Sequence, residues 1–472
     1  MLFSSTIFLF LFLPLVICGY FLLYKPWRNY FLLLASLIFY GWGEPSFLLI
    51  MLASILANYG VGLLLGRCRS KSRAARAWLT VGIVWNLGLL FVFKYLNFTL
   101  HNLAALGLRV AGTNIALPIG ISFFTFQILS YIIDVYRGEV PVQKNPFYLG
   151  LYISFFPQLI AGPIVRYSTV MGEIRERSVG LSDFAEGAQR FIAGLFKKVM
   201  LANSLAVVAD RAFELAPEGI SAGLAWLGIL CYTLQIFFDF AGYSDMAIGL
   251  GRMFGFHFLE NFNYPYIAAS VTEFWRRWHI SLGTWFRDYV YIPLGGSRVR
   301  TAARAAGNIV VVWLLTGIWH GANWTFILWG LLHCLALLLE KFRIRPERFA
   351  ARRLPKNLYR LAVLLFIFFT LTIFRAESLT AAGEYLAALL GFGFGDDGLA
   401  ALYLREVWMF LLLGVLFSTP LFSRLGELLR QRLGGGETLF RALRAGLCLA
   451  MLLVCVSCLV TGSYNPFIYF NF

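Results

Sequence analysis

Long apolar segments that are almost free of charge constrain this chain more than any other feature of its sequence. A helix needs about 20 consecutive apolar residues to cross the hydrocarbon core of a bilayer, and about eleven of the segments are expected to do so. The chain is 60% hydrophobic and 14% charged, whereas a soluble domain is about 25% charged, so a soluble globular protein is excluded. The segments lie at 6–24, 29–43, 46–65, 77–97, 115–136, 147–165, 189–209, 221–250, 306–319, 323–340, 359–374, 405–423 and 442–462.

Two of these segments, 115–136 and 147–165, are interrupted by helix-breaking residues. Broken helices at membrane depth are tolerated only where they are buried in protein or line a cavity. We therefore expect re-entrant elements here, within an all-α polytopic membrane protein. The interrupting residues are Pro118, Gly120, Pro157, Gly162 and Pro163.

The basic residues predict orientation. The net charge of +16 is better explained by basic cytoplasmic loops than by nucleic-acid binding, because Lys and Arg concentrate on that side of a membrane. Three clusters, at 67–76, 341–356 and 424–444, are therefore placed in the cytoplasm, and span counting puts both chain termini outside. We see no linker that would divide the chain, and expect one membrane domain (1–462) and a short aromatic tail (463–472).

Segment 272–298 is too charged to cross lipid, although it follows an apolar span. Its Trp275, His279, Leu282 and Phe286 recur at the spacing of one helical face. Glu273 is placed to pair with a basic residue three or four positions on. Two interpretations remain open: an interfacial amphipathic helix with an aromatic belt, or a buried helix that lines a polar cavity.

His320 lies where two apolar spans meet, between Trp319 and Gly321. Ionisable residues at membrane depth are costly, which makes function the default inference. A histidine can act as a general base toward a hydroxyl near neutral pH. Gly317 and Gly321 leave room for another chain or a ligand to come close. For His333 we expect packing or capping.

Two acids, Asp239 and Asp245, lie inside an apolar segment and should be paired or face water. Arg166 and Arg252 are candidate partners. The histidines have no short ligand spacing and no cysteine pair supports a zinc site, so we predict no metal.

Five segments together resemble the membrane-bound O-acyltransferase family, and more narrowly its bacterial members that serve alginate and peptidoglycan O-acetylation. The resemblance covers nearly the whole chain. The segments are LPIGISFFTFQILSYIIDVYRGE (117–139), FFPQLIAGPIVRY (155–167), the stretch around Asp245, FWRRWHISLGTWFRDYVYIPLGG and WHGANWTFILWG.

The resemblance implies a ring of transmembrane helices around a thin centre, with a tunnel joining the two membrane faces. It implies that His320 is the catalytic histidine and that His279 is a second histidine of the site. By the same resemblance, five residues are expected to line the tunnel: Trp275, Arg276, Arg277, Trp319 and Asn323.

The last residues carry a second resemblance. Phe467, Tyr469 and Phe472 match the F-x-Y-x-x-F ending of a small companion peptide of teichoic-acid D-alanylation systems, whose tyrosine is thought to carry the acyl group. A phenol ester keeps much of the acyl-transfer potential of a thioester, so Tyr469 is a candidate acyl relay.

These observations predict an O-acetyltransferase of the cell inner membrane that uses cytoplasmic acetyl-CoA as donor and has no tightly bound cofactor. Because no external loop is large enough to grip a polymer, a periplasmic transferase is the expected partner, besides membrane lipids. Three alternatives stay open: a D-alanyl transferase that uses a carrier-protein thioester, a secondary transporter, and an assembly scaffold for polysaccharide export.

Overall fold

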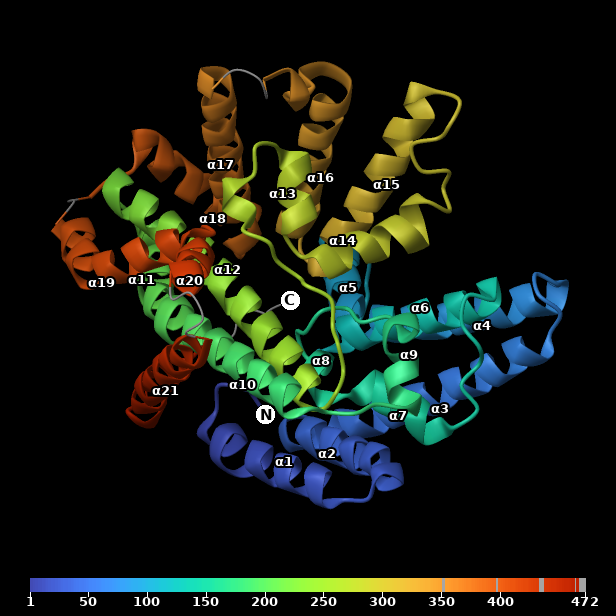
Figure 1. The fold of residues 1–472 in the computed structure, drawn as a ribbon. Helices are drawn as coiled ribbons and strands as arrows, with labels where there is room; N and C mark the ends of the chain where they lie inside the picture. The colour runs from blue at the N-terminus through green and yellow to red at the C-terminus, as the bar shows by residue number, and fades with distance from the viewer. Residues whose placement is uncertain (350–352, 396–397, 433–436, 463, 467–472) are drawn as a thin grey trace. The chain divides into compact units, whose positions relative to one another are not determined.

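Helices make up the regular structure of the described residues, which in this computed structural model are 1–349, 353–395, 398–432, 437–462 and 464–466 (Figure 1). No strand occurs among them. The predicted all-α class is therefore confirmed.

The chain forms two compact units. Met1–Phe191 with Ser244–Leu259 form the first, and Ile192–Tyr243 with Glu260–Phe472 form the second. The first contains α1 (Leu13–Leu22), α2 (Arg28–Gly43), α3 (Pro45–Arg67), α4 (Arg73–Leu90), α5 (Leu96–Ala105), α6 (Ile121–Arg137), α7 (Pro146–Ser154), α8 (Phe156–Leu159) and α9 (Tyr167–Arg175). Two of the unit boundaries fall within α10 (Leu181–Phe196) and α12 (Ala222–Met253), and the third falls after α12, between Leu259 and Glu260.

The second unit contains the remaining helices. These are α11 (Asn203–Leu215), α13 (Val271–Arg277), α14 (Ile280–Phe286), α15 (Ala302–His320), α16 (Trp324–Leu339), α17 (Arg353–Arg375), α18 (Leu379–Ala387), α19 (Gly398–Phe417), α20 (Leu421–Arg432) and α21 (Glu437–Val460).

The number of full spans is lower than predicted. In the described part of the chain, nine helices are long and apolar enough to cross a membrane. Segments 6–24 and 29–43 account for the difference, because their helices are shorter than the roughly 20 residues that a full span needs. The first gives the shorter helix Phe8–Leu22, and the second gives the 16-residue α2.

The two interrupted segments differ from each other. Segment 147–165 is broken as predicted: α7 ends at Ser154, Phe155 leaves helical geometry, and α8 has only four residues. Segment 115–136 is continuous from Ile121 onward, because its breakers lie before α6 rather than inside it. Whether either element is re-entrant stays a prediction, as do the ring arrangement and the orientation.

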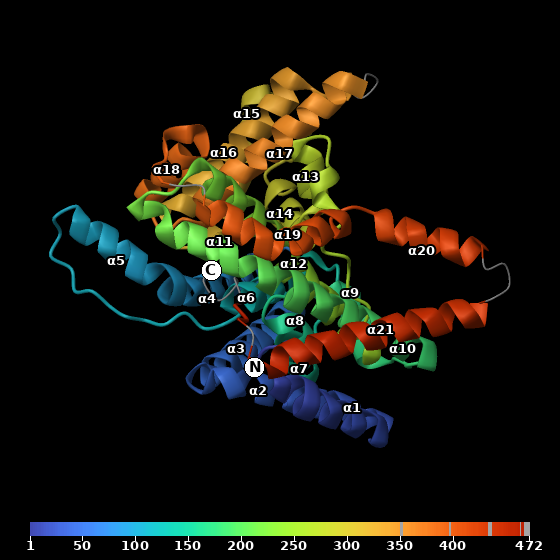
Figure 2. The same ribbon diagram turned by 90° about the vertical axis from the view of Figure 1, so that its left-hand side faces the viewer.

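Within the second unit, α13 to α17 form the group that positions the functional residues (Figure 1). α15 packs along α16, α16 packs against α17, and α13 contacts both α14 and α16. The apolar core here is rich in aromatic residues, including Trp313, Phe326, Trp329 and Phe374. α20 follows α19 and precedes α21 along the chain, and none of its residues is buried (Figure 2).

Candidate functional site

The turn between α15 and α16 fixes the position of His320, the last residue of α15. Asn323 begins α16 by accepting a hydrogen bond from the Thr325 amide, which satisfies an otherwise unpaired helix donor. Gly317 lets the helices approach closely, because a Cβ there would lie 2.6 Å from the Phe326 carbonyl oxygen. The predicted location of His320, at the join of two spans, is confirmed.

The side chain of His320 is buried among aromatic rings. Trp319 and Trp329 both lie edge-on to it at 5.0 Å between ring centroids, and Phe374 does so at 5.3 Å. His320 lines a small cavity of about 20 Å³. The imidazole is therefore held in one orientation and shielded from solvent.

The segment around His279 contains two short helices rather than the single helix that its apolar spacing predicts. α13 ends at Arg277, and His279 adopts a left-handed backbone conformation with φ at +45°. The Ile280 amide then donates to the Asn261 carbonyl, 2.9 Å away. The loop segment that contains Asn261 therefore supports the break between the two helices. Periodicity cannot reveal such a break because the residues on both sides keep their apolar spacing.

The hydrogen bonds around His279 define its tautomer. Asn261 Oδ1 accepts from the Ser281 amide at 3.2 Å and from the Ser281 hydroxyl at 2.9 Å, which identifies this atom as the amide oxygen. His279 Nδ1, 3.2 Å from the same oxygen, must then be the protonated ring nitrogen. Burial lowers the pKa of His279 to about 3. The ring is therefore neutral at pH 7, with its lone pair on Nε2.

One tryptophan connects the two histidines. The Trp319 ring lies 6.1 Å from the His279 ring and 5.0 Å from the His320 ring. Phe240 covers another face of His279 at 4.6 Å. The structure thus brings together both histidines that the sequence singles out, because the Trp319 ring contacts both of them.

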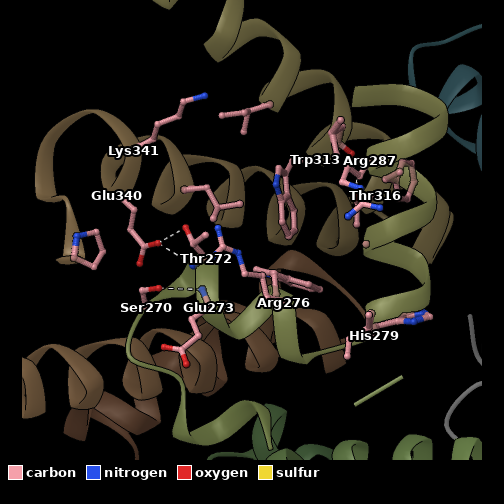
Figure 3. Close-up of a pocket in the computed structure, with 18 of the residues that line it drawn as sticks. Ser270, Thr272, Glu273, Arg276, His279, Arg287, Trp313, Thr316, Glu340 and Lys341 are labelled. Carbon is pink, nitrogen blue, oxygen red and sulfur yellow. Dashed lines mark hydrogen bonds between the residues drawn. The ribbon is translucent and has the colours of Figure 1, made fainter. Parts of the chain in front are cut away.

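A large cavity of about 1240 Å³ reaches His279 from the loop after α16 (Figure 3). Trp275 and Arg276 both line it, and whether this cavity is the expected tunnel stays a prediction. Lys341 and Lys356 add two further cations to its wall. In Figure 3, His279 and Lys341 lie at opposite ends of the drawn group, so the cavity extends from a basic rim toward the buried histidine.

An acidic residue of the same cavity, Glu340, is already engaged by the protein. Its carboxylate accepts from the Val271 amide at 2.6 Å and from the Thr272 amide at 2.8 Å, and so caps the start of α13. Tyr359 donates to it as well, at 2.8 Å. A carboxylate at a helix N-terminus is stabilised there, so Glu340 holds α13 in place.

Two other residues expected to line the tunnel have structural roles. Arg277 forms an ion pair with Glu273 at 2.7 Å, which confirms the pairing predicted for that acid. Asn323, besides capping α16, donates to the Glu377 carbonyl at 2.8 Å. Arg277, Asn323 and Trp319 are not among the described residues that line the large cavity.

Trp275 has a second contact that the sequence does not suggest. Its indole N–H donates to His333 Nδ1 at 3.1 Å. His333 is buried, stacks on Trp313 at 5.5 Å and lies 4.8 Å from Trp329. The packing role expected for His333 is confirmed, and its hydrogen bond fixes the orientation of Trp275.

Both acids of the apolar segment have basic partners, as predicted. Asp239 pairs with Lys198 at 2.6 Å, and Asp245 pairs with Arg190 at 2.9 Å. Arg252 instead forms ion pairs with two acidic residues of α10. Sequence reasoning missed Lys198, although a lysine inside an apolar segment is itself a signal of a buried partner.

The residues that follow α21 are held by polar groups of the second unit. Phe467, Tyr469 and Phe472 lie outside the described residues, so the relay motif itself stays a prediction. The contacts are Tyr464 Oη to Asp210 Oδ2 (2.9 Å), Asn203 Nδ2 to Asn465 Oδ1 (3.1 Å) and Lys198 Nζ to the Pro466 carbonyl oxygen.

Two supporting residues had no signal in the sequence. Asn261 and Glu340 organise His279 and α13 through contacts over 18 and 69 residues of chain. In the described part of the chain, no group of three or more His, Cys, Asp or Glu side chains could hold a metal ion.

Comparison with known proteins identifies the family of the chain. The membrane-bound O-acyltransferase family matches residues 142–381. A probable alginate O-acetylase of Azotobacter vinelandii is 47% identical, over 83% of this chain and 79% of its own length. A probable alginate O-acetylase of Pseudomonas putida is 41% identical over the full length of both chains. The peptidoglycan O-acetyltransferase of Helicobacter pylori is 38% identical, over 83% of this chain and 80% of its own length.

Nine helices of the described residues are long and apolar enough to span a bilayer, which defines a polytopic membrane protein. The chain belongs to the membrane-bound O-acyltransferase family. It is an O-acyltransferase of a cellular membrane.

Proposed function

We propose that this enzyme transfers an acetyl group from cytoplasmic acetyl-CoA for the O-acetylation of an extracytoplasmic polysaccharide. The observation that carries the proposal is the pair His320 and His279, joined by Trp319 beside a large cavity with a basic rim. The activities for which the relatives are named, on alginate and on peptidoglycan, support a polysaccharide as the final acceptor.

The basic rim supports coenzyme A as the donor. Arg276, Lys341 and Lys356 line the large cavity. Of the acids among the described lining residues, Glu340 is engaged by the start of α13 and Glu273 by an arginine, whereas Glu347 shares the wall with the cations. Cations not neutralised by neighbours attract phosphate groups. Lys341 and Lys356 belong to the basic segment 341–356, which supports a cytoplasmic opening in an inner-membrane protein with both termini outside.

The proposed reaction needs one base and one nucleophile. His320 removes the proton of an acceptor hydroxyl while that oxygen attacks the thioester carbonyl. A C–O bond forms, the C–S bond breaks, and the thiolate takes up a proton and leaves as free CoA. Neutral His279 accepts a hydrogen bond at Nε2 and so orients the hydroxyl.

The C-terminal tyrosine is the proposed first acceptor. Tyr469 would carry the acetyl group as a phenol ester until a periplasmic transferase moves it to a sugar hydroxyl. Support comes from the residues just before it, Tyr464 to Pro466, which are tied to the second unit by three hydrogen bonds.

The test combines two measurements on wild type, His320→Ala, His279→Ala and Tyr469→Phe. Purified protein is incubated with acetyl-CoA and analysed by intact mass, with mapping of the C-terminal peptide. The O-acetyl content of the exported polysaccharide is measured in cells that carry each variant. His101→Ala is the matched control because His101 is exposed and far from the site in sequence.

We expect His320→Ala to reduce acetylation by about 10²-fold or more, the usual contribution of a general base. An adduct on Tyr469 that requires His320 supports the relay. Normal acetylation in His320→Ala refutes the proposed catalytic role. Turnover only with an aminoacyl carrier protein would indicate a D-alanyl transferase instead of an acetyltransferase. Flux of a substrate across the membrane without acyl transfer would indicate a transporter. Activity that survives loss of both histidines would indicate a scaffold.

A further inference from the structure

The cavity that contains His320 is much smaller than the one that contains His279. Its volume is about 20 Å³. A cavity of roughly 10–15 Å³ accommodates a single water-sized group. The space beside His320 therefore accommodates a methyl group and little more.

The wall of this small cavity is almost entirely apolar. Phe274, Trp278, Trp329 and Phe374 supply aromatic surface, and Thr370 supplies one hydroxyl. No carboxylate occurs among the described residues that line it. An acyl group with a charged ammonium would be unpaired there, which is costly, so the wall disfavours aminoacyl groups.

Trp275 separates the small cavity from the large one. Among the described residues, it alone lines both. Its position is fixed on several sides: the indole N–H donates to His333 Nδ1 at 3.1 Å, Trp313 lies edge-on at 4.7 Å and Trp329 lies edge-on at 5.6 Å. A ring held this firmly acts as a rigid wall rather than a flexible side chain.

We propose that Trp275 is the specificity-determining residue of this enzyme, and that it limits the acyl group that reaches His320 to a small uncharged one of about two carbons. The inference rests on the proposed function, because it assumes that the donor enters through the large cavity. His333 is the positioning residue that holds Trp275.

The test compares acetyl-, propionyl- and butyryl-CoA as donors for the purified protein, measured as free CoA released with the acceptor system present. We expect wild type to use propionyl-CoA at least about tenfold less well than acetyl-CoA, since one methylene is worth about 10–200-fold in an apolar pocket. In Trp275→Ala, the propionyl-to-acetyl ratio should rise at least about tenfold. The ratio is measured on one preparation, so it does not depend on the fraction of protein that is folded.

Two further variants keep the test decisive. Trp408→Ala is the control, because Trp408 is 56% exposed and lies on α19; its donor ratio should match wild type. Leu371→Ala enlarges the same small cavity from α17 and should also raise the ratio.

Each outcome has a distinct meaning. Unchanged donor ratios in both Trp275→Ala and Leu371→Ala overturn the inference, as does loss of all activity in two variants that remain folded. Equal use of acetyl- and butyryl-CoA by wild type refutes the size limit but leaves the proposed function intact. Failure of wild type to use any acyl-CoA refutes the proposed function itself.

Discussion

The buried ion pair of Lys198 and Asp239 gives a strong test of the second unit. The two side chains are 2% and 1% exposed, and Nζ lies 2.6 Å from Oδ1. Removing one member of a buried pair leaves an uncompensated charge and costs about 3–5 kcal/mol. We therefore expect Lys198→Met and Asp239→Leu each to lower the free energy of unfolding by about that amount.

The double variant, Lys198→Met with Asp239→Leu, separates this mechanism from simple loss of packing. With both charges removed, no charge is buried without a partner, so the cost should fall well below the sum of the single costs. Unfolding is followed by tryptophan fluorescence in mixed micelles with increasing denaturing detergent.

The exposed pair Arg211 and Glu214 is the control. Its side chains are 50% and 65% exposed, and removing a surface pair typically costs about 0–1 kcal/mol. The reasoning would be refuted if the single variants of the buried pair lowered the free energy of unfolding no more than Glu214→Gln does. Strictly additive single and double costs would refute it as well.

Two further predictions concern the site. Because burial lowers the pKa of His279 to about 3, the unfolded state binds a proton below about pH 6.5 that the folded state does not. The free energy of unfolding should therefore fall as pH drops, by about 1.4 kcal/mol between pH 7.5 and 5.5. If the His279→Asn variant loses stability with pH as steeply as wild type, the prediction is wrong. Gly317→Ala should destabilise the protein and reduce activity, because its Cβ would lie 2.6 Å from a backbone oxygen; the control Gly307→Ala, which has open space, should be neutral or slightly stabilising.

The sequence alone predicts the class of the fold and the position of His320. Apolar segments reveal membrane helices because bilayer thickness sets their length. A histidine beside glycine at the end of such a segment indicates a functional residue because its burial is costly. The same rule predicts paired acids, and both Asp239 and Asp245 have basic partners.

The internal geometry of the site could not be predicted in this way. His279 has a left-handed backbone that glycine or asparagine more often adopts, so no propensity indicates the break between α13 and α14. Asn261 and Glu340 act through contacts that are distant along the chain, and a single sequence contains no record of such contacts. The orientation of Trp275 depends on its hydrogen bond to His333, 58 residues away.

Glu340 has a consequence for how the proposed donor would be recognised. Helix N-termini often bind phosphate through their free amides, but Glu340 already occupies the first amides of α13. A coenzyme would then be bound by Arg276, Lys341 and Lys356, whose long, flexible side chains select for negative charge more than for the shape of the ligand. The enzyme would thus bind the phosphate end of its donor through charge, with little selectivity for shape, and would select the acyl end by its size.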